Sequence, residues 1–186
     1  MRHLTLRRGV VALLLASAAA CSEAGEQQVL AASGDSELDS ADQVAFGFRT
    51  LLTDAGLLRA EVFADTALFL DQSTRASLRQ VHGDFFGATG AKEASITAKL
   101  GKLDTRGNVL EAWGNVVITS VDGRVLKTPM IRFEQSRNQV TSDSAFVLTE
   151  PGEREIRGVG FRADPNLSSV QVLQATSGRG GTVRVP

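Results

Sequence analysis

Few side chains in this sequence are suited to acid–base or nucleophilic chemistry. His82 is the only histidine beyond the first twenty residues, and it lies in the strand-like run Gln80–Asp84. Histidine-based catalysis needs a nucleophile beside the imidazole, and a zinc site needs three or four protein ligands. We therefore interpret His82 as a half-exposed strand residue, and we predict no metal site and no cofactor.

Other motifs of catalytic type are equally weak. The sequence holds no Gly-Lys-Ser/Thr phosphate loop. Gly158–Gly160 lies in a strand-like run, where such glycines are typical of a bulge or a close backbone approach. Glu153, Glu155 and Asp143 are turn or surface types, which do not indicate the carboxylate pair of a glycosidase. We predict that the protein is not an enzyme.

Composition and charge suit one folded domain in a chain of 186 residues. Hydrophobic residues make up 42% and charged residues 22%, and the net charge of −1 argues against a basic nucleic-acid-binding face. A single cysteine excludes an intrachain disulfide framework. No apolar run approaches the roughly 20 residues that span a bilayer as a helix.

The first twenty-one residues have the features of an export signal. Arg2–Arg8 supplies positive charge, and Gly9–Ala20 is an apolar stretch that is short for a membrane span but suits a signal peptide. Small residues ahead of Cys21 are similar to a bacterial lipobox, although Ala18 stands where leucine is usual. We predict that residues 1–20 form a signal peptide and that Cys21 becomes lipidated. Ordinary cleavage after Ala20, leaving a free cysteine, is the alternative.

Residues 21–41 are small and polar, with five acidic residues and no Lys or Arg. Such a segment buries too little apolar surface to fold alone. We predict a lipid-anchored flexible tether over 21–41, a β-domain over 42–178 and a C-terminal tail over 179–186.

From residue 42 onward the apolar pattern has a period of two, which predicts β-strands. Asp42–Leu52 fits a helix or a strand, and Asp122-Gly123 predicts a two-residue hairpin loop. Together with the intervening turn residues, the pattern predicts eight or nine antiparallel strands. The further strand-like segments are Ala60–Ala64, Ala76–Val81, Glu93–Leu100, Val109–Ser120, Arg124–Glu134, Gln139–Thr149, Glu155–Ala163 and Ser168–Gln174.

Several of these strands are apolar on both faces, as in Val116–Ile118 and Met130–Phe133. This favours an all-β fold, a twisted antiparallel two-sheet sandwich or jelly roll that is open at its ends. An open sheet exposes unpaired N–H and C=O groups at its edges, where another protein can add a strand.

Four segments in this order resemble the LptC family, the periplasmic component of lipopolysaccharide export. They are Leu110–Ile118 with Trp113-Gly114-Asn115-Val116, Leu126–Ile131 with Thr128, Asn138–Val147 with Val140-Thr141-Ser142-Asp143, and the glycine-rich Ile156–Phe161. Ala55–Ala67 and Ala98–Asp104 are similar to the family's preceding strands, so the resemblance covers about residues 44–174.

The resemblance implies a β-jelly roll that is not an enzyme and that holds lipid A acyl chains between its two sheets. It also implies transfer of the lipid to the next jelly roll, driven by a cytoplasmic ATPase. The implied partners are lipopolysaccharide, the membrane ABC-transporter subunits and an LptA-like periplasmic jelly roll, the proteins joining by edge-strand addition.

The residues that we expect to face the lipid slot lie at alternate strand positions. A single bulge would reverse the facing set. The expected residues are Val62, Phe69, Leu78, Phe85, Ile96, Leu100, Trp113, Val116, Ile118, Ile131, Phe133, Phe146 and Phe161.

The anchor departs from the family pattern, because many members have one N-terminal transmembrane helix. We expect a periplasmic protein held by Cys21 at the inner membrane, with the outer membrane as the alternative, since Ser22 is not the aspartate that marks inner-membrane retention. The competing function is a lipid-anchored structural or interaction β-sandwich of the cell envelope with a fully packed interior and no lipid slot.

Overall fold

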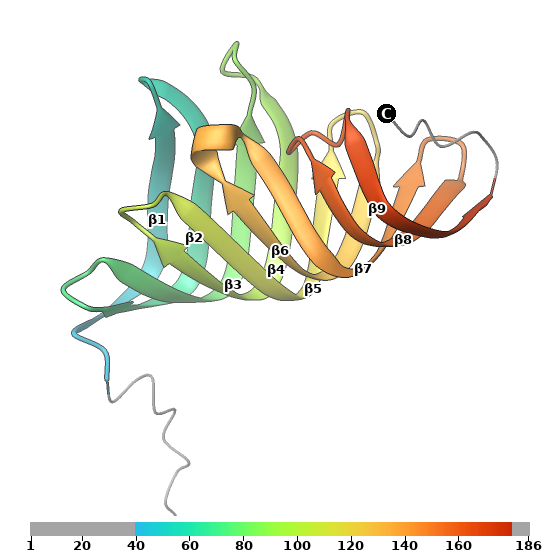
Figure 1. Ribbon diagram of the computed structural model, residues 1–186. Coiled ribbons are helices and arrows are strands. Elements are labelled where there is room, and N and C mark those ends of the chain that lie inside the picture. Colours follow the sequence, from blue (N-terminus) through green and yellow to red (C-terminus); the bar gives the residue numbers. More distant parts are fainter. Residues whose placement is uncertain (1–39, 180–186) are drawn as a thin grey trace, which may run out of the picture. The chain divides into compact units, whose positions relative to one another are not determined.

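A computed structural model describes residues 40–179, which form one antiparallel sheet of nine strands in chain order (Figure 1). The predicted signal peptide, Cys21, nearly all of the predicted tether and the tail from residue 180 lie outside the described residues. The short 3-10 turn η1 (Gln135–Arg137) joins β6 to β7. The strands are β1 (Gln43–Asp54), β2 (Leu57–Leu70), β3 (Arg75–Phe86), β4 (Lys92–Asp104), β5 (Val109–Ser120), β6 (Val125–Glu134), β7 (Gln139–Glu150), β8 (Arg154–Ala163) and β9 (Val170–Arg179).

The predicted all-β fold with eight or nine antiparallel strands is confirmed. The ambiguous segment Asp42–Leu52 is a strand, because β1 pairs along β2 from Gln43 to Asp54. Gly47 adopts φ +62 within β1, a left-handed conformation that interrupts a helix or a strand and that glycine accepts without a side-chain clash.

The Asp122-Gly123 hairpin is present, with a loop one residue longer than the sequence predicts. The Ser120 amide donates to the Arg124 carbonyl oxygen at 2.9 Å, so Val121, Asp122 and Gly123 form the loop. Gly123 has φ +90, as expected for a three-residue loop that ends in a left-handed residue.

Most strands bend near their middle, where the pairing register is interrupted. In the β5–β6 pair the interruption lies between Trp113 and Val116, and in the β7–β8 pair it lies between Ser142 and Ala145. Asn115 has φ +55, a left-handed conformation that redirects the chain at the β5 bend. Each bent strand therefore contributes one half to each of two layers.

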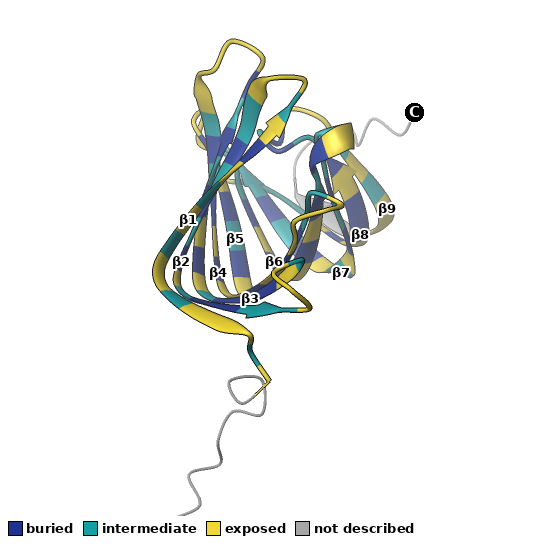
Figure 2. Ribbon diagram, turned by 90° about the vertical axis from the view of Figure 1, so that its left-hand side faces the viewer, coloured by how far each residue is buried: buried dark blue, intermediate teal, exposed yellow. Residues whose placement is uncertain are grey.

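The two layers are defined by the turns at their ends. Layer A contains the strand halves that meet at the β2–β3, β4–β5, β6–β7 and β8–β9 connections. Layer B contains the halves that meet at the β1–β2, β3–β4, β5–β6 and β7–β8 connections. The buried residues follow the strands in alternation with exposed ones (Figure 2).

Aromatic contacts join the inner faces of the two layers. In each pair one ring comes from layer B and the other from layer A, with the rings edge to face, a favourable aromatic geometry. The predicted two-layer sandwich is thus one unclosed sheet folded on itself. The pairs and their centroid distances are Phe48–Phe69 at 5.6 Å, Phe85–Phe133 at 4.9 Å and Phe146–Phe161 at 5.1 Å.

Candidate functional site

Most of the side chains that we expected to face a lipid slot lie in the interior between the two layers. Phe69 is partly buried and packs against this core. The side chains that the structure places fully inside are Val62, Leu78, Phe85, Ile96, Val116, Ile118, Ile131, Phe133, Phe146 and Phe161.

Leu100 and Trp113 do not share this interior position, which corrects the expected facing set. Ala98 and Gly101 are both buried, so the two residues between them, Lys99 and Leu100, point outward in a bulge. Leu100 is 39% exposed and pairs with the half-buried Trp113 of β5. On β4 the bulge shifts the facing set by one residue, whereas on β5 Trp113 alternates with the buried Ala112 and so faces the other way.

The buried polar residues of the described chain are all uncharged: Ser77, Ser120, Thr128, Gln135 and Ser142. A buried charge without a partner costs several kcal/mol, so a wholly neutral interior is consistent with an apolar ligand or an apolar core. The geometry alone therefore fits both the slot and the packed sandwich.

Thr128 and Ser142 bridge a gap in the sheet between β6 and β7, where the regular pairing stops between Lys127 and Arg132. The Thr128 hydroxyl donates to the Ala145 carbonyl oxygen at 3.0 Å, and the Ser142 hydroxyl donates to the Met130 carbonyl oxygen at 2.7 Å. These bonds satisfy carbonyl groups that the bend removes from the ladder. Both hydroxyl residues belong to the segments that carry the family resemblance.

The β8–β9 connection closes part of the end of the interior that lies opposite the bends. We call residues 164–169 the mouth loop. Leu167 is only 2% exposed and lies in the core cluster, although its φ is +59. Its carbonyl oxygen accepts from Arg124 Nη1 at 3.0 Å, and Asn166 Nδ2 donates to Glu93 at 3.0 Å.

From the sequence, residues 164–167 are only a connection between two strand-like segments, and nothing in the pattern indicates this closing role. The partners lie 43 and 73 residues away in the chain, in the β5–β6 loop and in β4. Local sequence carries no signal for such pairings, apart from the single apolar residue within a polar loop.

Among residues 40–179, no Asp, Glu, Lys, Arg or His residue is fully buried. His82 is exposed, as predicted, and its Nε2 lies 3.4 Å from Asp84 Oδ1, which also pairs with Lys92 at 2.7 Å. The backbone amides of Gly107 and Arg106 lower the pKa of Asp104, which caps the β4–β5 turn. Within residues 40–179, no group of three or more His, Cys, Asp or Glu side chains could hold a metal ion.

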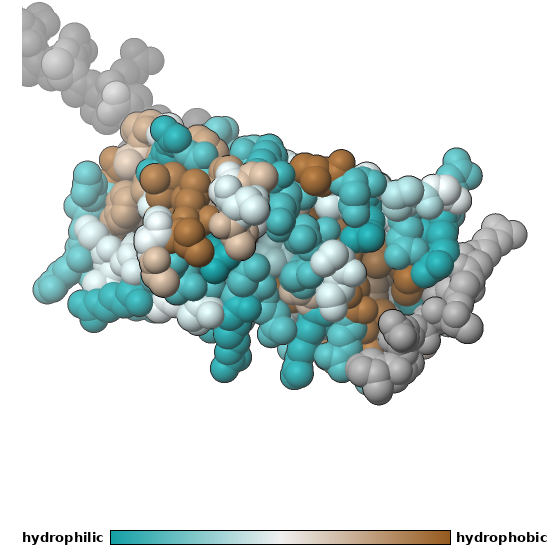
Figure 3. Space-filling model, turned by 90° about the horizontal axis from the view of Figure 1, so that it is seen from above, coloured by the Kyte–Doolittle hydropathy of each residue, from teal (hydrophilic) through white to brown (hydrophobic). Residues whose placement is uncertain are grey.

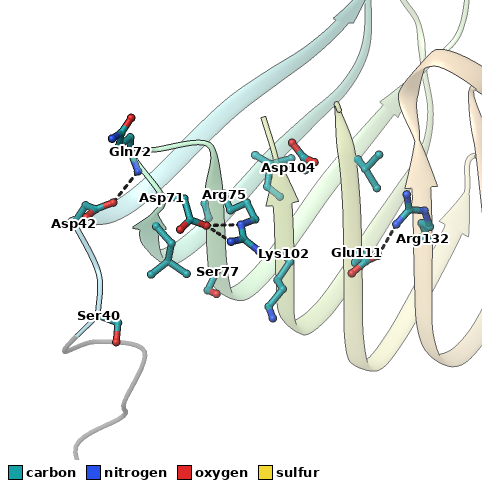
Figure 4. A pocket seen from close by; sticks show the side chains of 14 residues that line it. Ser40, Asp42, Asp71, Gln72, Arg75, Ser77, Lys102, Asp104, Glu111 and Arg132 are labelled. Atoms are coloured by element: carbon teal, nitrogen blue, oxygen red, sulfur yellow. Dashed lines mark hydrogen bonds and ion pairs between the residues drawn. The ribbon is translucent and has the colours of Figure 1, made fainter. Parts of the chain in front are cut away.

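A charged cleft of about 570 Å³ lies over the outer face of layer A (Figure 4). Its two arginines pair with carboxylates of the same cleft: Arg75 Nε donates to Asp71 at 2.6 Å, and Arg132 Nη1 donates to Glu111 at 2.6 Å. Hydrogen bonds to Glu134 and Glu111 raise the pKa of Arg132. Both arginines of the cleft therefore already have carboxylate partners.

The family comparison decides between the broad functional classes. Residues 9–180 match the protein family described as lipopolysaccharide-assembly, LptC-related. The chain belongs to this family. The resemblance read from the sequence is thereby confirmed, and it assigns this LptC-related chain to lipopolysaccharide transport in the periplasm.

A solved structure similar to this LptC-related chain is LptH of Pseudomonas aeruginosa, described as the LptA-homologous periplasmic component of the lipopolysaccharide transport device. The similarity covers 68% of this chain and 88% of LptH, with 20% sequence identity and a TM-score of 0.44. No curated protein sequence matches the chain. None of the helices within residues 40–179 is long and apolar enough to cross a membrane.

Proposed function

We propose that this LptC-related protein holds the acyl chains of lipopolysaccharide between layers A and B and passes them to a neighbouring jelly roll. The observation that carries the proposal is the interior itself, which is lined by apolar side chains from both layers and has no charged residue in the described buried set. Viewed from above, hydrophobic side chains are also visible between hydrophilic ones at the surface (Figure 3).

Acyl chains enter this interior when the two layers move apart. The layers are held together by a continuous core of buried apolar side chains, within which the three aromatic pairs are each worth about 0.5–1.5 kcal/mol beyond the area that they bury. A 14-carbon acyl chain buries about a dozen methylenes, or roughly 10 kcal/mol at about 0.8 kcal/mol each. Burial of the lipid therefore offsets part of the apolar contact that the layers lose when they move apart.

The two edge strands of the sheet are the surfaces at which neighbouring proteins bind in this proposal. β1 and β9 each pair on one side only, because the sheet does not close. On β1, Phe46 is 80% exposed and Val44 is 37% exposed, which is unusual for large apolar side chains. We propose that the ABC-transporter subunits and an LptA-like jelly roll pair with these edges by strand addition.

We further propose that Cys21 carries the lipid anchor and holds the protein at the inner membrane. The transport role requires no bond making or breaking by this chain, so we propose that it is not an enzyme. Mass spectrometry of the mature N-terminus tests the anchor: an acylated Cys21 is expected, and an unmodified Cys21 would contradict the lipid anchor.

Filling the interior tests the lipid slot. Ala98 is buried in layer B, and Ala98→Phe should weaken lipopolysaccharide binding by tenfold or more, since overpacking by a side chain of this size costs about 1–3 kcal/mol. Ala88→Phe, at an exposed turn, is the matched control and should bind like the parent protein. The measurement is binding of purified lipopolysaccharide to protein whose fold is checked by circular dichroism.

A folded Ala98→Phe protein that binds lipopolysaccharide with unchanged affinity would contradict the slot. That outcome would favour the structural sandwich, for which the close aromatic contacts between the layers are the supporting observation.

A further inference from the structure

A second apolar concavity lies on the outer face of layer B, beside the bends of β5–β8. We call it the outer groove. Its volume is about 1120 Å³, comparable with the roughly 300–1,000 Å³ of small-molecule pockets. Its lining includes Trp113, Pro129, Met130, Ala145 and Val159 from the bends.

The outer groove is separate from the interior. Its middle is one cross-strand row of outward-facing residues, Val117, Lys127, Val147 and Arg157, which are paired in register from β5 to β8. The fully buried residues in its lining are Val116, Thr128, Phe146 and Gly158, and each is a chain neighbour of a residue in this row. No deeper core residue such as Ile118 or Phe161 contributes to the lining.

The charges in the outer groove are of one sign. Lys127 and Arg157 line it, and no Asp or Glu does. Arg157 pairs with Glu155 at 2.8 Å, outside the lining. Among the residues that the structure describes, the Lys127 side chain has no hydrogen-bond or ion-pair partner. An apolar floor with an unpaired lysine beside it is chemically complementary to an acyl chain that ends in an anionic group.

We propose that the outer groove binds a long-chain fatty acid, with its carboxylate at Lys127 and its acyl chain on the apolar lining beside this lysine, from Val147 in the row to Met130 and Ala145 at the bends. This site goes beyond the proposed function, because it lies on the opposite side of layer B from the lipopolysaccharide interior. The two sites can therefore fail or succeed independently.

Trp113 is the only tryptophan of the chain and lines the outer groove, so its fluorescence reports occupancy directly. The full chain is titrated with 9,10-dibromostearate below its micelle concentration. Bromine atoms in the groove should quench Trp113 saturably. Val147→Glu, which places a carboxylate in the apolar floor, should abolish the saturable quenching.

The lysine is tested by a matched pair of substitutions. Lys127→Gln should weaken dibromostearate binding about fivefold, the size expected for one lost exposed charge pair. Lys92→Gln, the same change in a lysine that faces Asp84, should leave the affinity unchanged. Tetradecanoate should compete with the probe more strongly than tetradecanol, which lacks the charge.

The interior variant Ala98→Phe separates this proposal from the previous one, because it should leave Trp113 quenching intact. Quenching that does not saturate, that persists in Val147→Glu or that disappears in Ala98→Phe would overturn the outer groove as the site. Equal affinity of the parent protein and Lys127→Gln, with equal competition by the acid and the alcohol, would overturn the assignment of the carboxylate to Lys127.

Discussion

Leu167 closes the mouth of the interior from a strained backbone position, and replacing it gives a quantitative test of the fold. The side chain is 2% exposed and packs in the core, so Leu167→Ala should lower the free energy of unfolding by about 2–4 kcal/mol. For a domain of this size, a loss near 3 kcal/mol corresponds to a fall of roughly 6–12 °C in Tm.

The backbone conformation makes the comparison of alanine with glycine informative. At an ordinary position glycine is less stable than alanine by roughly 0.5–1 kcal/mol. Leu167 has φ +59, where an L side chain costs about 1–2 kcal/mol, so Leu167→Gly should be more stable than Leu167→Ala. Urea unfolding followed by Trp113 fluorescence measures both values.

Leu173→Ala is the control, since this leucine is 46% exposed on β9 and its loss should cost under about 0.5 kcal/mol. A Leu167→Ala protein as stable as the parent would show that the mouth loop does not pack as described. A Leu167→Gly protein less stable than Leu167→Ala would contradict the left-handed backbone at this residue.

Two further predictions concern the turns and the open edge. The pKa of Asp104 is lowered by backbone amides, so its contribution to stability is present above its unfolded pKa of about 3.9 and is lost as the pH falls through the lower folded value. The protection factor of the Gly107 amide against hydrogen exchange should fall over that acid range, and Asp104→Ala should remove this pH dependence of the protection factor; a protection profile in the variant that matches the parent would argue against this cap. Phe46→Glu should leave stability within about 0.5 kcal/mol, because the ring is 80% exposed, but should reduce co-purification of the partners that we propose pair with β1. The same substitution at the exposed turn residue Val121 should have no such effect, and equal recovery of partners with both variants would exclude Phe46 from the interface.

The strands were predictable from sequence because their residues satisfy local rules. Alternating apolar residues and turn residues located every strand, although β2, β3, β4 and β9 extend four to six residues beyond the predicted segments, and Asp122-Gly123 located a hairpin. The segment that became β1 was ambiguous, because Gly47 breaks both the helical and the strand pattern, and only its pairing with β2 determines its structure.

The facing of individual side chains was harder to predict, because it depends on the bulges. Leu100 follows the alternation from Ile96, but two consecutive residues of β4 point outward at the bend and Leu100 becomes exposed. β5 also bends, yet Ala112 and Val116 on either side of its bend both face inward. The irregular segment between them therefore leaves the alternation of inward and outward residues unchanged. Sequence alone does not distinguish these two kinds of bend.

Features that depend on distant pairing were not accessible from the sequence. The outer groove forms where residues of β5, β6, β7 and β8 fall into one cross-strand row, and its register is interrupted at each bend. The mouth loop likewise depends on Arg124 and Glu93, which are remote in the chain.

Site-specific photo-crosslinking in cells tests the central claim, that lipid lies between the two layers, most directly. A benzophenone amino acid is placed at Phe133 or Phe161, which are fully buried, and at their outward-facing neighbours Arg132 or Arg162. We expect lipopolysaccharide adducts at Phe133 and Phe161 and few or none at the two arginine positions. Adducts confined to the arginine positions, with none at the phenylalanines, would contradict the claim.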